Sequence, residues 1–160
     1  MPVHHERRRL PYTAAQVFDI VAAVDRYPEF LPWCLSARIT RREADSFEAD
    51  LVIGFKMVRE RFASRVLLER PHRIVARETS GPFRRLNNLW HFTDLGEGGC
   101  EVDFHIDFEF RSRLLNKLIG LLFHEAVRRL VAAFDGRARA LYGTGQGTLA
   151  RAASDQLTSS

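Results

Sequence analysis

One segment, CEVDFHIDFEF at residues 100–110, alternates strictly between apolar and polar side chains. A period of two residues is that of a β-strand with one buried face and one solvated face. Strands of this kind belong to antiparallel sheets that are covered on one face only. The apolar face of this strand consists of Val102, Phe104, Ile106, Phe108 and Phe110.

A long amphipathic helix is predicted directly after this strand. Ser112 is a suitable N-cap, and apolar residues recur at helical spacing from 113 to 141. Shorter strands are expected upstream, each bounded by turn residues. They cover residues 4–10, 35–43, 47–55, 59–69 and 73–79, and a stretch around Trp90.

A second, shorter helix is predicted near the start of the chain. Thr13 and Gln16 have the spacing of a capping box, which begins a helix at Ala14. We expect the helix to end near Asp25, because Pro28 disfavours helical geometry at the residue before it.

This order of elements predicts an α+β helix-grip fold. A twisted sheet with one apolar face curls, and one long helix fills the concavity. The 160 residues, 46% of them hydrophobic, suffice for one domain. We assign it to residues 1–142 and predict that the Gly-, Ser- and Thr-rich residues 143–160 are a disordered tail.

The composition favours a reduced, cytoplasmic protein. The N-terminus is charged, and the most apolar run, residues 114–123, is about half as long as a bilayer span requires. Cys34 and Cys100 lie far apart and form no C-x-x-C motif, which favours two free thiols. The net charge of +4 comes mainly from arginine clusters that face phosphates of lipid or RNA, or only solvent.

The stretch YPEFLPWC, residues 27–34, is an unusual loop because it is both stiff and apolar. Its two prolines restrict the backbone, and its large side chains are too apolar for an ordinary solvated loop. Two interpretations stay open. Phe30, Leu31 and Trp33 either close the mouth of a cavity or fill the edge of the core.

Three stretches resemble one known family. RYPEFLPWC at residues 26–34, GPFRRLNNLWHF at residues 81–92, and the alternating strand with its following helix are similar to the coenzyme Q-binding branch of the START and polyketide cyclase-like superfamily. The resemblance runs from His4 to Tyr142. It implies a helix-grip fold with a tunnel between the sheet and the C-terminal helix.

The resemblance also implies a function, since relatives include mitochondrial coenzyme Q-binding proteins and bacterial ribosome-association toxins. The leading expectation is non-enzymatic binding of coenzyme Q (ubiquinone) in support of respiration. The bound quinone is then a ligand, and no cofactor is required. A ribosome-association toxin that binds RNA or a ribosomal subunit, and a polyketide cyclase or aromatase, are the alternatives. No oligomeric state is assigned.

Aromatic and aliphatic residues of the strands and the long helix are expected to line the tunnel, where they suit a polyprenyl tail. The set comprises Phe55, Phe62, Trp90, Phe92, Phe104, Phe108, Leu115, Leu118, Leu122 and Phe123.

We find no catalytic or metal motif in the sequence. His124 and Glu125 begin an H-E-x-x-H pattern, but Arg128 stands where the second histidine is needed. The acidic residues on the polar face of strand 100–110 are expected either to be solvated or to pair with arginine across strands. Glu60 and Glu78 are the candidates for orienting a polar head group, because each shares a face with apolar neighbours.

The start of the long helix is a candidate membrane contact. Leu114 and Leu121 fall on the side of Lys117, away from the stripe that faces the sheet. They either dip into the boundary of a membrane, at the inner face of the cytoplasmic membrane, or pack beneath YPEFLPWC or against a second copy.

Overall fold

The computed structural model describes residues 3–55 and 58–143, except for the side chains of residues 55 and 58. Within this part of the chain, a seven-stranded antiparallel sheet has the order β1-β7-β6-β5-β4-β3-β2. Its strands are β1 (Val3–Leu10), β2 (Cys34–Arg42), β3 (Ser46–Phe55), β4 (Val58–Glu69), β5 (Arg73–Ser80), β6 (Phe83–Gly96) and β7 (Gly99–Phe110). The helices are α1 (Ala14–Ala22), the 3-10 helix η1 (Val24–Glu29) and α2 (Arg113–Tyr142).

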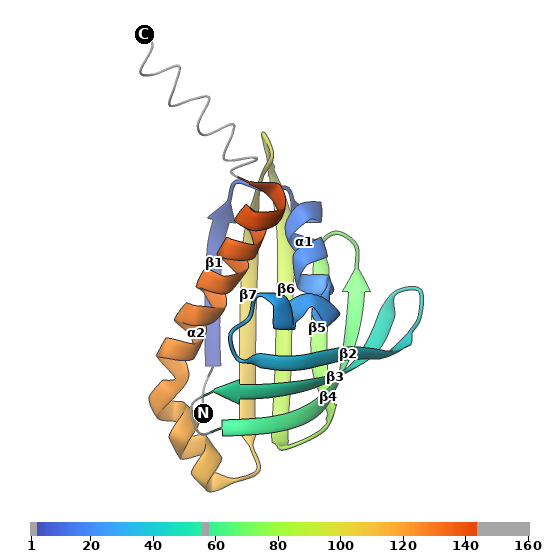
Figure 1. The fold of residues 1–160 in the computed structure, drawn as a ribbon. Coiled ribbons are helices and arrows are strands. Elements are labelled where there is room, and N and C mark those ends of the chain that lie inside the picture. The colour runs from blue at the N-terminus through green and yellow to red at the C-terminus, as the bar shows by residue number, and fades with distance from the viewer. Residues whose placement is uncertain (1–2, 56–57, 144–160) are drawn as a thin grey trace.

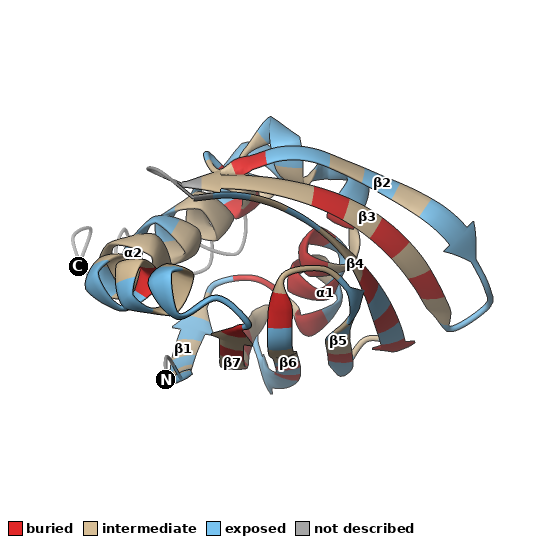
Figure 2. Ribbon diagram, turned by 90° about the horizontal axis from the view of Figure 1, so that it is seen from below, coloured by how far each residue is buried: buried red, intermediate tan, exposed pale blue. Residues whose placement is uncertain are grey.

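The sheet curls around α2, as the helix-grip prediction required. β2, β3 and β4 cross the front of the molecule while β5, β6 and β7 run behind them (Figure 1). Seen from below, α2 lies on the inner side of the curve (Figure 2). Bulges contribute to this shape, with shifts of register between Ile39 and Arg41 and between Ala63 and Ser64.

The capping box predicted for α1 is present. The Thr13 hydroxyl accepts from the Gln16 amide at 3.1 Å, and the Gln16 side chain accepts from the Thr13 amide at 2.9 Å. The end of α1 differs from the expectation, because the α-helix stops at Ala22 and η1 follows it. Pro28 lies inside η1, where the tighter 3-10 turn accommodates it.

The core divides into two clusters along the sheet. The larger one includes Phe18 of α1 and Phe92 of β6, whose rings meet edge to face at 5.8 Å. The smaller one lies near the start of α2 and contains Phe83, Phe110 and Ile119. Of the 30 residues of α2, only Ile119 and Ala138 are fully buried. The long helix therefore does not lie flush on the sheet, and space remains beneath it.

The outer face of the sheet is held by ion pairs, as predicted for the acidic row of β7. Asp103 binds Arg7 at 3.1 Å, and Asp107 binds Arg85 at 2.9 Å. Cys34 and Cys100 are both buried and free, which confirms the prediction of two thiols.

Candidate ligand-binding cavity

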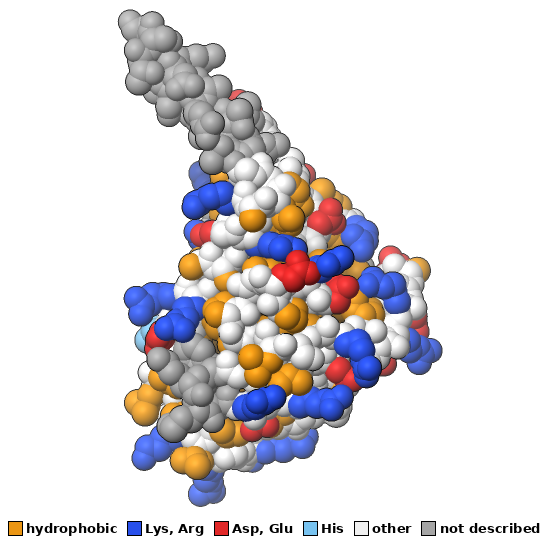
Figure 3. Space-filling model, in the orientation of Figure 1, with side chains coloured by type: hydrophobic (Ala, Val, Ile, Leu, Met, Phe, Trp, Pro, Cys, Tyr) orange, Lys and Arg blue, Asp and Glu red, His pale blue; other side chains and the backbone are white. Residues whose placement is uncertain are grey.

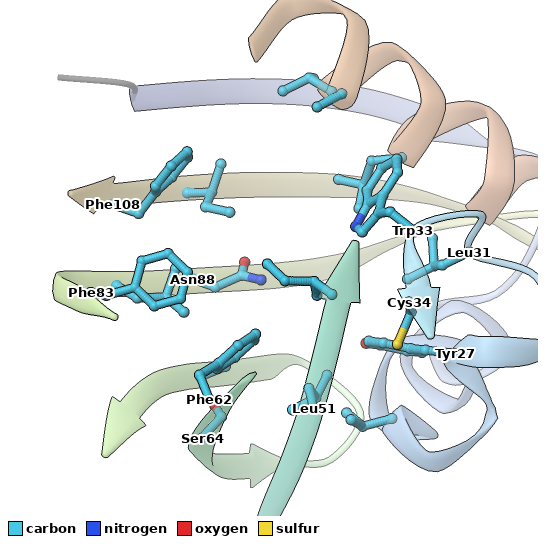
Figure 4. A pocket seen from close by; sticks show the side chains of 18 of the residues that line it. Tyr27, Leu31, Trp33, Cys34, Leu51, Phe62, Ser64, Phe83, Asn88 and Phe108 are labelled. Carbon is cyan, nitrogen blue, oxygen red and sulfur yellow. The ribbon is translucent and has the colours of Figure 1, made fainter. Parts of the chain in front are cut away.

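A cavity of about 250 Å³ lies between the concave face of the sheet and α2. Its wall is formed by side chains from α1, η1, the loop after η1, six strands and α2, and none of these side chains is charged. Most wall residues from the sheet alternate, since every second side chain points inward, and a shift of register after Phe83 separates it from Leu86 by three residues. On β6 and β7 these are Phe83, Leu86, Asn88, Trp90, Ile106, Phe108 and Phe110. Figure 4 shows part of this wall.

Five residues of α2 complete the wall, and they repeat at helical spacing: Ile119, Phe123, Ala126, Val127 and Leu130. Ala126 and Ala76 of β5 carry small side chains, so the facing surfaces leave a hollow instead of interdigitating.

Of the residues of α2 that were predicted to line the cavity, one lines it and three do not. Phe123 lines the cavity, but Leu115, Leu118 and Leu122 are not among its described wall residues. Leu115 and Leu122 pack against the smaller core cluster, and Leu118 is half-buried. The reason is the rotation of about 100° per residue, which turns the neighbours of Ile119 to the flanks of the helix.

Two predicted sheet residues also belong to the core rather than to the wall. Phe92 is fully buried beneath α1. Phe104 is 5% exposed and packs against Trp90, with ring centroids 4.3 Å apart. Alternation places both on the inward face, but α1 covers Phe92, and Phe104 borders a separate, smaller cavity of about 50 Å³ between α1, α2 and the sheet.

Three of the four remaining predicted sheet residues line the cavity. Phe62, Trp90 and Phe108 all line it. Phe55 is the last residue of β3, and its side chain lies outside the described part of the structure.

The stretch YPEFLPWC divides between the two interpretations. Leu31 and Trp33 line the cavity. Phe30 does not, because its ring packs edge to face on Phe134 of α2 at 5.3 Å, and the Arg137 guanidinium lies 5.1 Å from its centroid. Phe30 therefore fastens the loop to α2, while its neighbours close the cavity.

Glu78 lies on the inward face of β5, two residues beyond Ala76. Desolvation raises the pKa of its carboxyl, and the Phe83 amide and the Arg111 charge oppose this shift. Its Oε2 is buried without a partner. Glu60 lies opposite Ile53, which is a wall residue. Neither carboxylate is among the described wall residues, so both candidates flank the cavity.

Four polar wall residues were missed as site candidates in the sequence: Tyr27, Cys34, Ser64 and Asn88. Burial raises the pKa of the Tyr27 phenol and raises that of the Cys34 thiol to about 11. Both groups are therefore neutral at pH 7. Strand alternation was the available signal for Ser64 and Asn88, because Phe62 and Trp90 share their faces.

The candidate membrane contact is exposed. Leu114 is 74% and Leu121 is 79% exposed, and Lys117 lies between them on the surface. Neither leucine packs beneath YPEFLPWC, so that alternative is wrong. Among the described residues, no helix is long and apolar enough to cross a membrane. No group of His, Cys, Asp and Glu in the same part of the chain has the arrangement of a metal site.

The family follows from comparison with known proteins. Residues 10–135 match the family described as polyketide cyclase / dehydrase and lipid transport, and the chain belongs to it. The sheet and α2 of this chain form the START-like fold of this family.

Two kinds of named relatives share most of the chain. The ribosome association toxin RatA of Pseudomonas aeruginosa is 35% identical over 144 residues, which are 89% of this chain and all of that protein. The mitochondrial coenzyme Q-binding protein COQ10 homolog B of Xenopus laevis is 33% identical over 154 residues, which are 94% of this chain and 63% of that protein.

Solved structures agree on the fold. The 18 kDa protein CC1736 of Caulobacter crescentus is 36% identical with a TM-score of 0.73, and the match covers 89% of this chain and 99% of that one. The Zhui aromatase/cyclase of Streptomyces sp. R1128 is 16% identical with a TM-score of 0.74, over 90% and 99% of the two chains. The second likeness concerns the fold alone.

Proposed function

We propose that this chain binds coenzyme Q, or a closely related polyprenyl quinone, and carries out no reaction on it. The observation that carries the proposal is a cavity whose described wall is mostly aromatic and aliphatic and contains no charged side chain. A quinone has an uncharged ring and a hydrocarbon tail, and each buried CH₂ group contributes up to about 0.8 kcal/mol. The name of the COQ10 homolog B relative supports the same ligand.

The size of the cavity sets how a long quinone fits. Its volume of about 250 Å³ lies just below the range of about 300–1,000 Å³ for small-molecule sites. It therefore takes the ring and the first part of the tail, and the rest of the tail extends beyond the wall. An exposed tail favours transfer of the quinone at a membrane.

The wall also argues against a cyclase. General acid–base catalysis needs a group whose pKa lies near the working pH. The pKa of Cys34 is about 11, and that of Tyr27 is raised by burial, so neither exchanges a proton readily at pH 7. The described wall contains no histidine or carboxylate that takes their place.

Mass spectrometry of an organic extract from the purified protein tests the proposal. We expect a polyprenyl quinone from the wild type and much less from Ala126→Trp, which fills the space beneath α2. Phe92→Leu, outside the described wall, is the matched control and should keep the quinone. An extract without quinone, from protein that also takes up none when it is added, contradicts the proposal.

Ribosome association is the second candidate, and a feature of the outer face favours it. Arg65 of β4 lies directly opposite Arg77 of β5 and, on its other side, opposite Glu48 of β3, so the two exposed arginines have one acidic cross-strand neighbour in the described pairing. Like charges at directly opposed positions destabilise a sheet. An anionic partner such as ribosomal RNA removes this cost, and the relatives named RatA support such a partner.

We also propose a peripheral membrane contact at the start of α2. The segment from Arg111 to His124 contains three cations and no acidic residue. With Leu114 and Leu121 exposed beside Lys117, this surface combines apolar anchors with charges that attract anionic lipids. Basic and hydrophobic side chains lie together along the lower edge of Figure 3, near the start of α2.

A further inference from the structure

The polar groups in the cavity wall differ in whether they already form a hydrogen bond within the protein. The Tyr27 hydroxyl donates to the Val21 carbonyl at 2.5 Å, and the Ser64 hydroxyl donates to the Arg77 carbonyl at 3.1 Å. The Cys34 thiol lies 3.7 Å from the Ser36 carbonyl. The donors of these three groups are already engaged by backbone carbonyls, so they are not available to a ligand.

Asn88 is different. Its Oδ1 is buried and has no hydrogen-bond partner among the described residues. An unpaired buried acceptor destabilises a fold, so such atoms are rare and call for an explanation. Trp33, the remaining wall residue with a polar atom, has an interaction of its own.

The position of Asn88 is central. It lies on β6 between Ala76 of β5 and Ile106 of β7, and both neighbours are wall residues. Along its own strand, Leu86 and Trp90 flank it on the same face. Figure 4 shows its amide between Phe83 and Phe62 on one side and the loop residues on the other. A polar group of a ligand that reaches Asn88 is therefore surrounded by apolar side chains.

We infer that Asn88 is the polar anchor of the cavity and selects ligands that have an uncharged, oxygen-bearing head. This rests on the proposed function and deepens it. The side-chain amide carries two N–H donors and one carbonyl acceptor. Its N–H groups donate to the oxygen of a quinone, ketone or ether, whereas the unpaired Oδ1 accepts only from a donor such as the hydroxyl of a quinol or alcohol.

The lack of charged side chains in the described wall selects against ligands with a charged head group. A carboxylate or phosphate at the position of Asn88 finds no cation there, and burial of an unpaired charge is strongly unfavourable. Fatty acids and phospholipids are thus excluded with their heads inside. A plain hydrocarbon is accepted by the wall but leaves the amide unpaired.

The two tryptophans of the chain provide the measurement, because Trp33 and Trp90 both line the cavity. Quenching of their fluorescence by a short-tailed ubiquinone gives its affinity. Competition against that signal gives the affinities of farnesene, a hydrocarbon, and of oleate. We expect Asn88→Leu to weaken ubiquinone binding by about tenfold, the loss of one hydrogen bond, and to bind farnesene at least as well as the wild type.

Asn87→Leu is the matched control, since the side chain of Asn87 points to the outer face of the same strand. It should leave every affinity unchanged. Asn88→Leu should also be as stable as the wild type or more so without ligand, because it removes an unpaired acceptor. Asn88→Thr, which is smaller and suits a strand, repeats the test if the leucine variant folds poorly.

The outcomes separate the two proposals. If the wild type binds neither ubiquinone nor farnesene, the proposed function fails. If the wild type binds ubiquinone and both Asn88 variants bind it equally well, quinone binding stands and the anchor is wrong. Tight binding of oleate by the wild type overturns the inferred preference for uncharged heads.

Discussion

Individual aromatic residues on the inward face of the sheet have two different roles. Phe92 is completely buried against Phe18, whereas Phe62 is half-buried and borders open space. Both satisfy the same alternation in sequence, so their roles depend on what lies above them. α1 covers Phe92, and the cavity lies over Phe62.

This difference predicts different costs for truncation. Phe92→Ala should lower the free energy of unfolding by about 3–5 kcal/mol, as expected for a buried phenylalanine. Phe62→Ala should cost less, because its ring already lacks contacts on the cavity side, yet it should reduce bound quinone more. Chemical denaturation and extraction of the same samples measure both quantities. Equal losses of stability would place Phe62 in the core.

The buried thiols predict a dependence of stability on pH. Burial raises the pKa of Cys34 and of Cys100 from 9.0 to about 11. Above pH 9.0 the unfolded chain loses these protons before the folded protein does, so the free energy of unfolding should fall between pH 9.0 and about 11. Denaturation of the wild type and of Cys34→Ala/Cys100→Ala across this range tests it. The variant should show a shallower fall, and identical slopes would contradict the assignment.

At the scale of elements, α2 presents two apolar surfaces. One faces the sheet through Ile119 and Phe123, and the other faces outward through Leu114 and Leu121. Residues 114 and 121 are seven apart and therefore lie on nearly the same side of the helix. An exposed pair of leucines beside Arg111, Arg113 and Lys117 has the form of an interfacial anchor.

This surface predicts binding to membranes. The wild type should float with vesicles that contain phosphatidylglycerol, and less so as salt is raised, because the cations attract anionic head groups. Leu114→Gln/Leu121→Gln should not float. Leu67→Gln/Leu89→Gln is the matched control, since these leucines are 43% and 38% exposed on the outer face of the sheet. Flotation that the first pair of substitutions leaves unchanged would remove α2 from the contact.

The elements and the order in which they occur were predictable from the sequence, and the cavity wall was only partly so. Strict alternation in β7 and the cap at Ser112 depend on local chemistry, and both were confirmed. The wall residues of α2 were misplaced because a broad apolar helix face does not show which stripe meets the sheet. Alternation with Trp90 placed Asn88 on the inward face, but it was missed as a site residue because the sequence does not show that a cavity lies over this position.

At the scale of the whole molecule, the cavity and the opposed pair Arg65 and Arg77 lie on opposite faces of the same sheet. Ser64 points inward from β4, and Arg65, the next residue, points outward. Neighbouring residues of one strand point to opposite faces, so Ser64 and Arg65 cannot contact the same ligand. The proposed quinone binding and the proposed ribosome association should therefore be separable by mutation.

The last prediction uses this separation. Arg65→Glu/Arg77→Glu should abolish co-sedimentation with ribosomal subunits at low salt, because it replaces two opposed cations with anions that RNA repels, and it should leave bound quinone unchanged. Ala126→Trp should do the reverse. Arg7→Glu/Arg9→Glu is the matched control, since these arginines are exposed on β1 but face Asp103 and Glu101. If the wild type does not sediment with subunits, the ribosome candidate fails. If filling the cavity also abolishes sedimentation, the two functions are coupled through the ligand, and their independence is wrong.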